Sequence, residues 1–194
     1  MSEERRDRAP LVALVVTLVV STLLVGAAVL VPLLVEESVD RTLDDVRVYE
    51  DLVIKHVEGD VDYEQDPPVG GPHADRWLDC GVYDTQVRPE NVVHDLEHGT
   101  VLISYRPGTP PADVDALAAV LPDNGILTPW RSQVAPVVVT VWGSQLSLIG
   151  ADDPRLALFI ESFGAGETAP EPFASCAGGL SDPLGGQDGT GLDI

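Results

Sequence analysis

The residues best suited to chemistry lie in the stretch VVHDLEHGTV, residues 92–101, which combines two histidines with a carboxylate. If the stretch is helical, His94 and His98 project from the same face and Glu97 lies beside them. Imidazole and carboxylate at this spacing can bind a metal ion, can activate a water molecule, or can form a hydrogen-bonded core. The stretch alone leaves these three interpretations open.

The same stretch matches H-x-x-E-H, the inverted zinc-protease signature, in which both histidines bind zinc and the glutamate is the general base. Glu97 would be that base. Such enzymes place the motif inside a long helix, whereas Gly99 and a β-rich segment follow at once here, so we expect a single helical turn. Glu161 or Glu167 could supply a later ligand, but nothing in the sequence selects either. A metal-dependent hydrolase is therefore the less favoured interpretation.

A third imidazole follows a loop rich in proline and glycine, PPVGGPH, residues 67–73. Because Pro and Gly fix the direction of a loop, His73 can be brought to His94 and His98 to form a three-histidine site. Glu97 would be its fourth ligand or a base. Imidazole donors suit divalent transition metals, and zinc or copper is the cofactor that we expect. The walls of the pocket are expected to be Pro68, Gly71, Trp77 and Gly99.

In the alternative interpretation these side chains have a structural role. The histidines would donate hydrogen bonds to Glu97, Asp95 or backbone carbonyls and hold the loops of the domain together, as in a non-enzymatic interaction module of the cell envelope. His56 stands beside a turn in a β-rich segment, and we expect it to be a surface residue or to fill the core.

Residues 11–35 contain no charged side chain. A helix of this length rises about 37 Å, which is enough to cross a hydrocarbon layer of about 30 Å. The stretch also has more residues than the apolar part of a cleaved signal peptide, which is about 7–15 residues long. Three arginines precede the stretch and two glutamates follow it, which places the N-terminus in the cytoplasm. We therefore predict a single-pass cell-membrane protein, with residues 1–10 cytoplasmic, a signal anchor at 11–35 in the lipid bilayer, and an extracytoplasmic remainder.

The net charge of −21 belongs to residues 36–194, because the first ten residues hold three basic and three acidic side chains that cancel. The remaining 8 basic and 29 acidic side chains all follow the predicted anchor. A domain of this charge is repelled by nucleic acid, which excludes nucleic acid as a partner.

Two cysteines, Cys80 and Cys176, also follow the predicted anchor. Outside the cytoplasm an isolated pair of cysteines most simply forms a disulfide. The competing interpretation, in which Cys80 is a catalytic thiol, is disfavoured by the even number of cysteines and by the compartment.

The chain after the anchor shows the pattern of a small α+β domain. Apolar residues at helical spacing (Val39, Leu43, Val46 and Val53) predict a juxtamembrane helix or stalk over residues 36–55. The domain itself is expected at 56–176, as a mixed sheet with about two packed helices. We expect strands at 100–107 and 126–130 and one extended piece at 136–150. The helices are expected at 112–125 and 153–163. The glycine-rich tail, residues 177–194, is expected to be disordered.

Several motifs occur together in a fixed order: PPVGGPH (67–73), CGVY (80–83), HDLEHG (94–99), VWG (141–143) and EPFASC (171–176). In these the chain resembles a bacterial family of membrane-anchored or secreted proteins that share a domain of unknown function, and the resemblance runs from about His56 to Cys176. It implies one extracytoplasmic domain behind a signal anchor. The positions that correspond to the family's motifs are Pro67, Pro68, Gly71, His73, His94, Glu97, His98 and Gly99. The family carries no established activity that the resemblance could transfer.

Overall fold

The computed structural model of the chain describes residue 19 and residues 41–185. The predicted signal anchor, apart from Val19, and the last nine residues of the predicted tail lie outside the described residues. Among the described residues, no helix is both long enough and apolar enough to cross a membrane.

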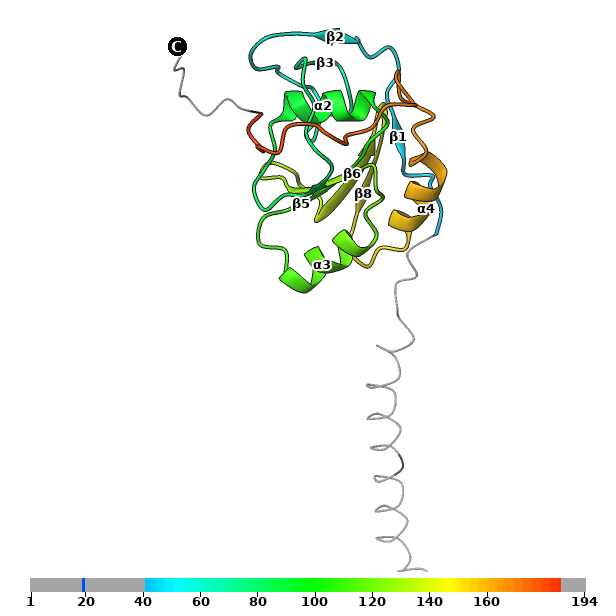
Figure 1. Ribbon diagram of the computed structural model, residues 1–194. Coiled ribbons are helices and arrows are strands. Elements are labelled where there is room, and N and C mark those ends of the chain that lie inside the picture. Colours follow the sequence, from blue (N-terminus) through cyan, green and yellow to red (C-terminus); the bar gives the residue numbers. More distant parts are fainter. Residues whose placement is uncertain (1–18, 20–40, 186–194) are drawn as a thin grey trace, which may run out of the picture. The chain divides into compact units, whose positions relative to one another are not determined.

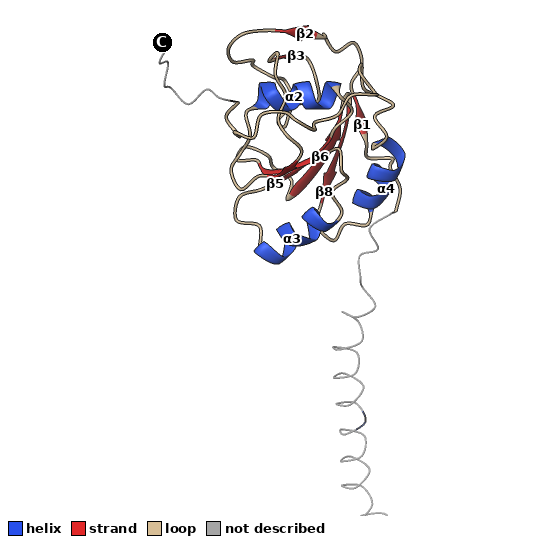
Figure 2. Ribbon diagram, in the orientation of Figure 1, coloured by secondary structure: helices blue, strands red, loops and turns tan. Residues whose placement is uncertain are grey.

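The domain is built on a six-stranded mixed sheet in the order β1-β8-β7-β5-β6-β4 (Figures 1 and 2). Strands β5 and β6 are parallel, as are β6 and β4, whereas β5, β7, β8 and β1 pair antiparallel. The strands are β1 (Arg47–Val48), β4 (Gly81–Val82), β5 (Val101–Tyr105), β6 (Gly125–Pro129), β7 (Val137–Val141) and β8 (Ser144–Leu148). The predicted α+β class with a mixed sheet is confirmed.

Three helices cover the two faces of this sheet (Figure 2). On one face, α3 (Pro111–Ala119) and α4 (Arg155–Phe163) pack over Val101, Ile103 and the odd-numbered valines of β7. On the other face, α2 (Pro89–Glu97) packs over Leu102 and Ile126. The successive side chains of β5 therefore enter two different cores, as the two-residue period of a strand requires.

A second, two-stranded parallel sheet pairs β2 (Lys55–His56) with β3 (Pro72–His73). In Figure 1 it lies above α2, with the six-stranded sheet below that helix. Helix α2 is thus enclosed between the two sheets, and eight of its nine residues are buried.

Three expectations from the sequence were wrong. The motif helix α2 has nine residues rather than a single turn, which adds a third helix to the two predicted. The extended piece at 136–150 is a hairpin, because Gly143 adopts a φ of 70° and reverses the chain between β7 and β8. Residues 41–53 form no helix: Arg47 and Val48 pair with β8, and Leu43 and Val46 pack against the core beneath α4.

The first part of the predicted disordered tail is also ordered. Leu180 forms a β-bridge with Leu78, and the amide of Arg88, just before α2, donates to the carbonyl of Pro183. Residues 177–185 therefore close over the start of the motif helix, although their composition alone predicted disorder.

Candidate metal centre

Helix α2 positions three of the predicted site residues at its C-terminal end. Pro89 begins the helix, where its missing N–H costs no hydrogen bond, and His98 is the C-cap. Gly99 then turns the chain with a φ of 77°, and a Cβ at this position would lie 2.9 Å from the Cα of Gly166. Only glycine fits here, so the sequence itself ends the helix directly after Glu97 and His98.

The loop PPVGGPH positions the fourth predicted ligand, His73, from the opposite side. Gly71 has a φ of 117°, which directs the chain into β3. Tyr63 holds this turn by donating from its hydroxyl to the carbonyl of Pro72 at 2.7 Å. The loop is ordered and delivers His73 over α2, as its proline and glycine content predicted.

The pairing of β2 with β3 brings in a histidine that the sequence did not indicate as a ligand. His56 and His73 are register partners, and their ring centroids lie 5.0 Å apart. The ring of His56 also stacks on that of His94, at 5.0 Å and an interplanar angle of 13°. The one available signal was the β-rich segment around His56, but nothing local identifies its partner strand.

Four side chains of different origin converge at this point. One ligand atom each from His56, His73, His94 and Glu97 lies within 4.8 Å of all the others. The Nε2 atom of His73 is 2.9 Å from Oε2 of Glu97, and that of His56 is 3.9 Å from the same oxygen. His73, His94 and Glu97 are buried, whereas 55% of the His56 side chain is exposed. We call these four residues together with His98 the histidine cluster.

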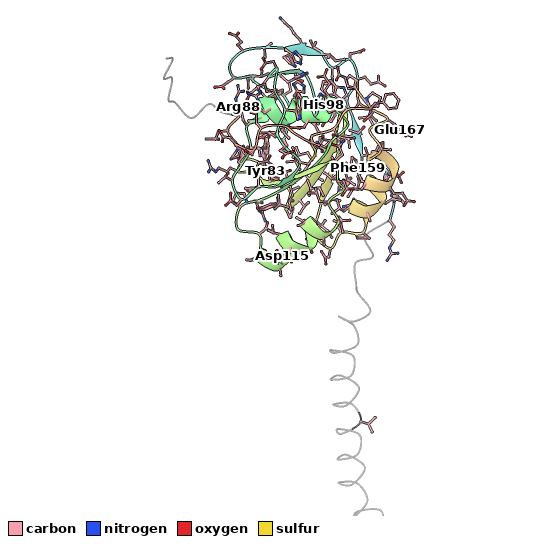
Figure 3. All side chains as sticks on the ribbon, in the orientation of Figure 1. Tyr83, Arg88, His98, Asp115, Phe159 and Glu167 are labelled. Carbon is pink, nitrogen blue, oxygen red and sulfur yellow. A yellow bond between two sulfur atoms is a disulfide. The ribbon has the colours of Figure 1, made fainter. Side chains whose placement is uncertain are left out.

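His98 falls outside the group of four but contacts it through His94. The two Nε2 atoms lie 3.1 Å apart, and Nε2 of His98 is 3.6 Å from Oε2 of Glu171. Figure 3 shows His98 at one end of α2 and Arg88 at the other. Of the four residues that the sequence predicted as ligands, His73, His94 and Glu97 meet directly, and His98 lies next to them.

The hydrogen bonds of the cluster determine which nitrogen of each buried ring carries the hydrogen. Nδ1–H of His73 donates to the carbonyl of Gly71 and that of His94 to Ala74, each at 2.8 Å, and Nδ1–H of His98 donates to Ser175 at 3.3 Å. Because a carbonyl only accepts, all three neutral rings present a bare lone pair at Nε2. Metal-binding histidines typically have their second nitrogen anchored in this way.

A metal ion, a shared proton or a water molecule that donates hydrogen bonds could satisfy these inward lone pairs. Two bare Nε2 atoms at 3.1 Å, those of His94 and His98, cannot form a hydrogen bond with each other. Burial lowers the pKa of His94, and nearby His98 and His73 lower it further, against the opposing effects of the Ala74 carbonyl and Glu97. A proton on His94 is therefore disfavoured, and a metal ion would satisfy several lone pairs at once.

Of the four predicted pocket residues, Trp77 and Gly71 contact the histidine cluster directly. The Trp77 ring lies 5.5 Å from that of His94 and 5.0 Å from that of His98. Gly71 supplies the carbonyl that orients His73, Gly99 ends α2, and Pro68 is buried in the loop. Asp95, considered from the sequence as a partner for histidine, instead accepts from the amide of Leu78 at 3.0 Å.

A disulfide joins Cys80 to Cys176, with the two Cα atoms 5.0 Å apart, as the sequence predicted. It excludes a free catalytic thiol at Cys80. Ser175, which accepts the hydrogen bond of His98, directly precedes the second cysteine, and Asn124 accepts from the amide of Cys176 while donating to the carbonyl of His98. The disulfide thus helps to hold the segment that orients His98.

Comparison with known proteins shows that the histidine cluster lies within a region that matches a protein family. Residues 56–178 match the model of a family described as a protein of unknown function, DUF3105. The matched region begins at His56 and contains the whole histidine cluster and both cysteines. No curated protein and no solved structure matches the chain.

Proposed function

We propose, for a chain that belongs to the DUF3105 family, that the domain binds one divalent transition-metal ion at the histidine cluster, with zinc or copper as the metal. The observation that carries this proposal is the orientation of His73, His94 and His98. Each ring is anchored outward through Nδ1 to a carbonyl, so that Nε2 of His73 faces the Glu97 carboxylate and the Nε2 atoms of His94 and His98 face each other. Imidazole nitrogen with one carboxylate oxygen is a donor set that zinc and copper(II) both favour.

The spacing of the donor atoms supports this assignment. With metal–nitrogen bonds of about 2.0–2.1 Å, neighbouring ligand atoms of a tetrahedral site lie about 3.3 Å apart. The distances of 2.9 Å between His73 and Glu97 and 3.1 Å between His94 and His98 are close to this value. We propose His73, His94 and Glu97 as the inner ligands, with His98 beside them as a further donor on the side of the protein interior.

Metal titration of the full chain, purified in detergent and freed of metal by a chelator, tests the proposal. We expect one equivalent of zinc or copper to bind and the melting temperature to rise, because a ligand that binds only the folded state stabilises it. His73→Ala and Glu97→Gln should abolish stoichiometric binding. Glu161→Gln, which removes an exposed carboxylate from α4, is the matched control and should bind like the wild type. Unchanged binding in His73→Ala would refute the ligand assignment.

A structural role for the same residues is the second candidate. It is favoured by the buried contact between Nε2 of His73 and Glu97, which is a hydrogen bond when a proton lies between them, and by the three bonds from Nδ1 to carbonyls, which connect the loop of β3, the end of α2 and the segment before Cys176. In that case the domain is a non-enzymatic interaction module. His73→Ala would then destabilise the chain equally with and without added metal, and metal would leave the melting temperature of the wild type unchanged.

We further infer an extracytoplasmic location behind a membrane anchor. The Cys80–Cys176 disulfide supports an oxidising compartment. The uncharged stretch 11–35, with arginines before it and glutamates after it, supports an anchor with its N-terminus in the cytoplasm. A phosphatase that requires disulfides for folding, fused after the last residue, should be active in cells. An inactive phosphatase, although the fusion protein is made, would place the domain in the cytoplasm.

A further inference from the structure

We infer that His56 is an exchangeable ligand of the proposed centre, and that the position it occupies is where the metal takes a small neutral donor, such as water or an imidazole, from solvent. This inference rests on the proposed function and goes beyond it, because it assigns an open coordination position rather than only a bound ion. Structural zinc sites are closed by protein ligands, whereas sites that bind and activate a small molecule keep one position open.

Exposure distinguishes His56 from every other member of the histidine cluster. The side chains of His73, Glu97 and His98 are at most 8% exposed and His94 is buried, whereas 55% of the His56 side chain is in contact with solvent. The four buried residues therefore have little freedom to leave the centre. A solvent-exposed histidine can change its rotamer without displacing packed atoms.

His56 also differs from the buried histidines in the hydrogen bonds that hold its ring. The Nδ1 atoms of His73, His94 and His98 each donate to a carbonyl, which fixes the ring. Among the described residues, no hydrogen bond holds the ring of His56. Its contacts are the stacking on His94, the edge of His73, and Nε2 at 3.9 Å from Glu97, which is beyond hydrogen-bond distance.

The strand that carries His56 is also weakly held. Strand β2 has two residues, both exposed, and pairs on one side only, with β3. The preceding Val53 and Ile54 are each 57% exposed, so that no apolar packing holds this segment from the solvent side. An edge element of this kind opens locally more readily than the core strands.

The stacking of the His56 ring shows which side chains become exposed to solvent when this ring moves away. The ring of His56 lies nearly parallel to that of His94 and against the edge of His73, so it covers the solvent side of the two buried imidazoles. If it rotates away, a metal held by His73, His94 and Glu97 faces solvent at that position. The Glu97 carboxylate lies in the cluster, and the exposed Glu58 follows His56 by two residues, so the negative charge on this side favours a neutral ligand over an anion.

Imidazole titration of the cobalt(II)-loaded full chain tests this inference, because the visible spectrum of cobalt(II) responds to its ligands. We expect His56→Ala to retain one equivalent of cobalt and to respond to imidazole at a concentration at least about tenfold lower than the wild type, in which imidazole must displace the side chain. Lys55→Ala, the exposed neighbour on β2, is the matched control and should behave like the wild type.

Two results would overturn the inference while leaving the proposed function intact. If His56→Ala loses cobalt as completely as His73→Ala, His56 is a required ligand and not an exchangeable one. If His56→Ala keeps cobalt but its spectrum does not respond to imidazole, the centre has no open position. A wild-type chain that binds no metal would instead refute the proposed function itself, and this inference with it.

Discussion

Backbone carbonyls, rather than neighbouring side chains, orient the buried imidazoles of the histidine cluster. The carbonyls of Gly71, Ala74 and Ser175 each accept from one Nδ1–H; the first two flank β3, and the third lies about a hundred residues later in the sequence. The types and spacing of His94, Glu97 and His98 predicted their proximity on one helical turn. The approach of His73 followed from its Pro/Gly loop. No residue pattern could place His56, because its position depends on pairing between two strands of two residues each.

Asp95 is a buried acid of α2 that lies outside the cluster and can be tested separately. Burial raises its pKa well above 3.8, the amide of Leu78 opposes this by donating to Oδ2, and Asp79 raises it further. Its Oδ1 atom is buried without a hydrogen-bond partner among the described residues. The charged form is therefore costly at neutral pH.

Asp95→Asn should raise the free energy of unfolding at neutral pH. Because the folded-state pKa lies above the unfolded value, the folded state keeps a proton that the unfolded state has lost, and stability falls as the pH rises through the folded pKa. The amide retains an oxygen for the Leu78 bond and carries no charge. Urea unfolding at about pH 4 and about pH 8 should show a gain only at the higher pH. An equal loss of stability at both pH values would contradict this account.

At the scale of elements, the site depends on where α2 ends. The helix is enclosed between the six-stranded sheet and the β2–β3 pair, and Gly99 stops it so that Glu97 and His98 meet the loop of His73. The sequence predicted the stop and the following strand, β5, because glycine and β-branched residues act locally. It did not predict the full length of α2, since Pro89 and Asn91 carry a weak helical signal that tertiary packing overrides.

Gly99→Ala should lower the free energy of unfolding by about 1–3 kcal/mol, because alanine is strained at positive φ. The new Cβ would also approach the Cα of Gly166 at 2.9 Å. Gly108→Ala is the control: its φ is 92°, but a Cβ there meets open space, so its cost should be about 1 kcal/mol. Chemical denaturation of both variants measures the difference. If both variants lose the same free energy of unfolding, the close approach of the new Cβ to Gly166 does not destabilise the Gly99→Ala variant.

The elements that the sequence misassigned are those decided by long-range contacts. Leu43 and Val46 have helical spacing, yet both pack against the core while Arg47 and Val48 pair with the edge of β8. Leu180, in a segment whose composition predicted disorder, is held by a bridge to Leu78 near the disulfide. By contrast α4 and the start of α3 were predicted correctly, because their apolar periodicity and the prolines before them are local signals; the end of α3 was not, since the helix stops at Ala119 and Gly125 begins β6.

At the scale of the whole molecule, acidity is the dominant property. The formal net charge is −21, and nearly all the acidic side chains lie in the part of the chain that forms and follows the domain. Like charges at this density repel one another and disfavour the compact state. Two largely buried ion pairs of arginine stabilise the compact state. Arg155 pairs with Asp153 at 2.7 Å, and Arg88 pairs with Glu90 at 3.1 Å.

Sodium chloride should therefore raise the melting temperature between about 0.05 and about 0.5 M, where the Debye length falls from about 14 Å to about 4 Å and repulsion is screened. The buried arginine pairs are screened less than surface charges, so the net effect is stabilising. Sucrose at matched osmolality controls for solvent exclusion. A melting temperature that falls as salt is added would show that attractive pairs, and not repulsion, determine the balance.

The central claim is that imidazoles from two separate segments, strand β3 with His73 and helix α2 with His94, share a metal ion with the carboxylate of Glu97. An anomalous difference map from crystals of the zinc- or copper-loaded chain, recorded at the metal's absorption edge, tests it directly. The account predicts one strong peak at about 2.0–2.2 Å from Nε2 of His73, Nε2 of His94 and a carboxylate oxygen of Glu97. A map with no peak at the cluster, or a peak bound only by surface carboxylates, would contradict it.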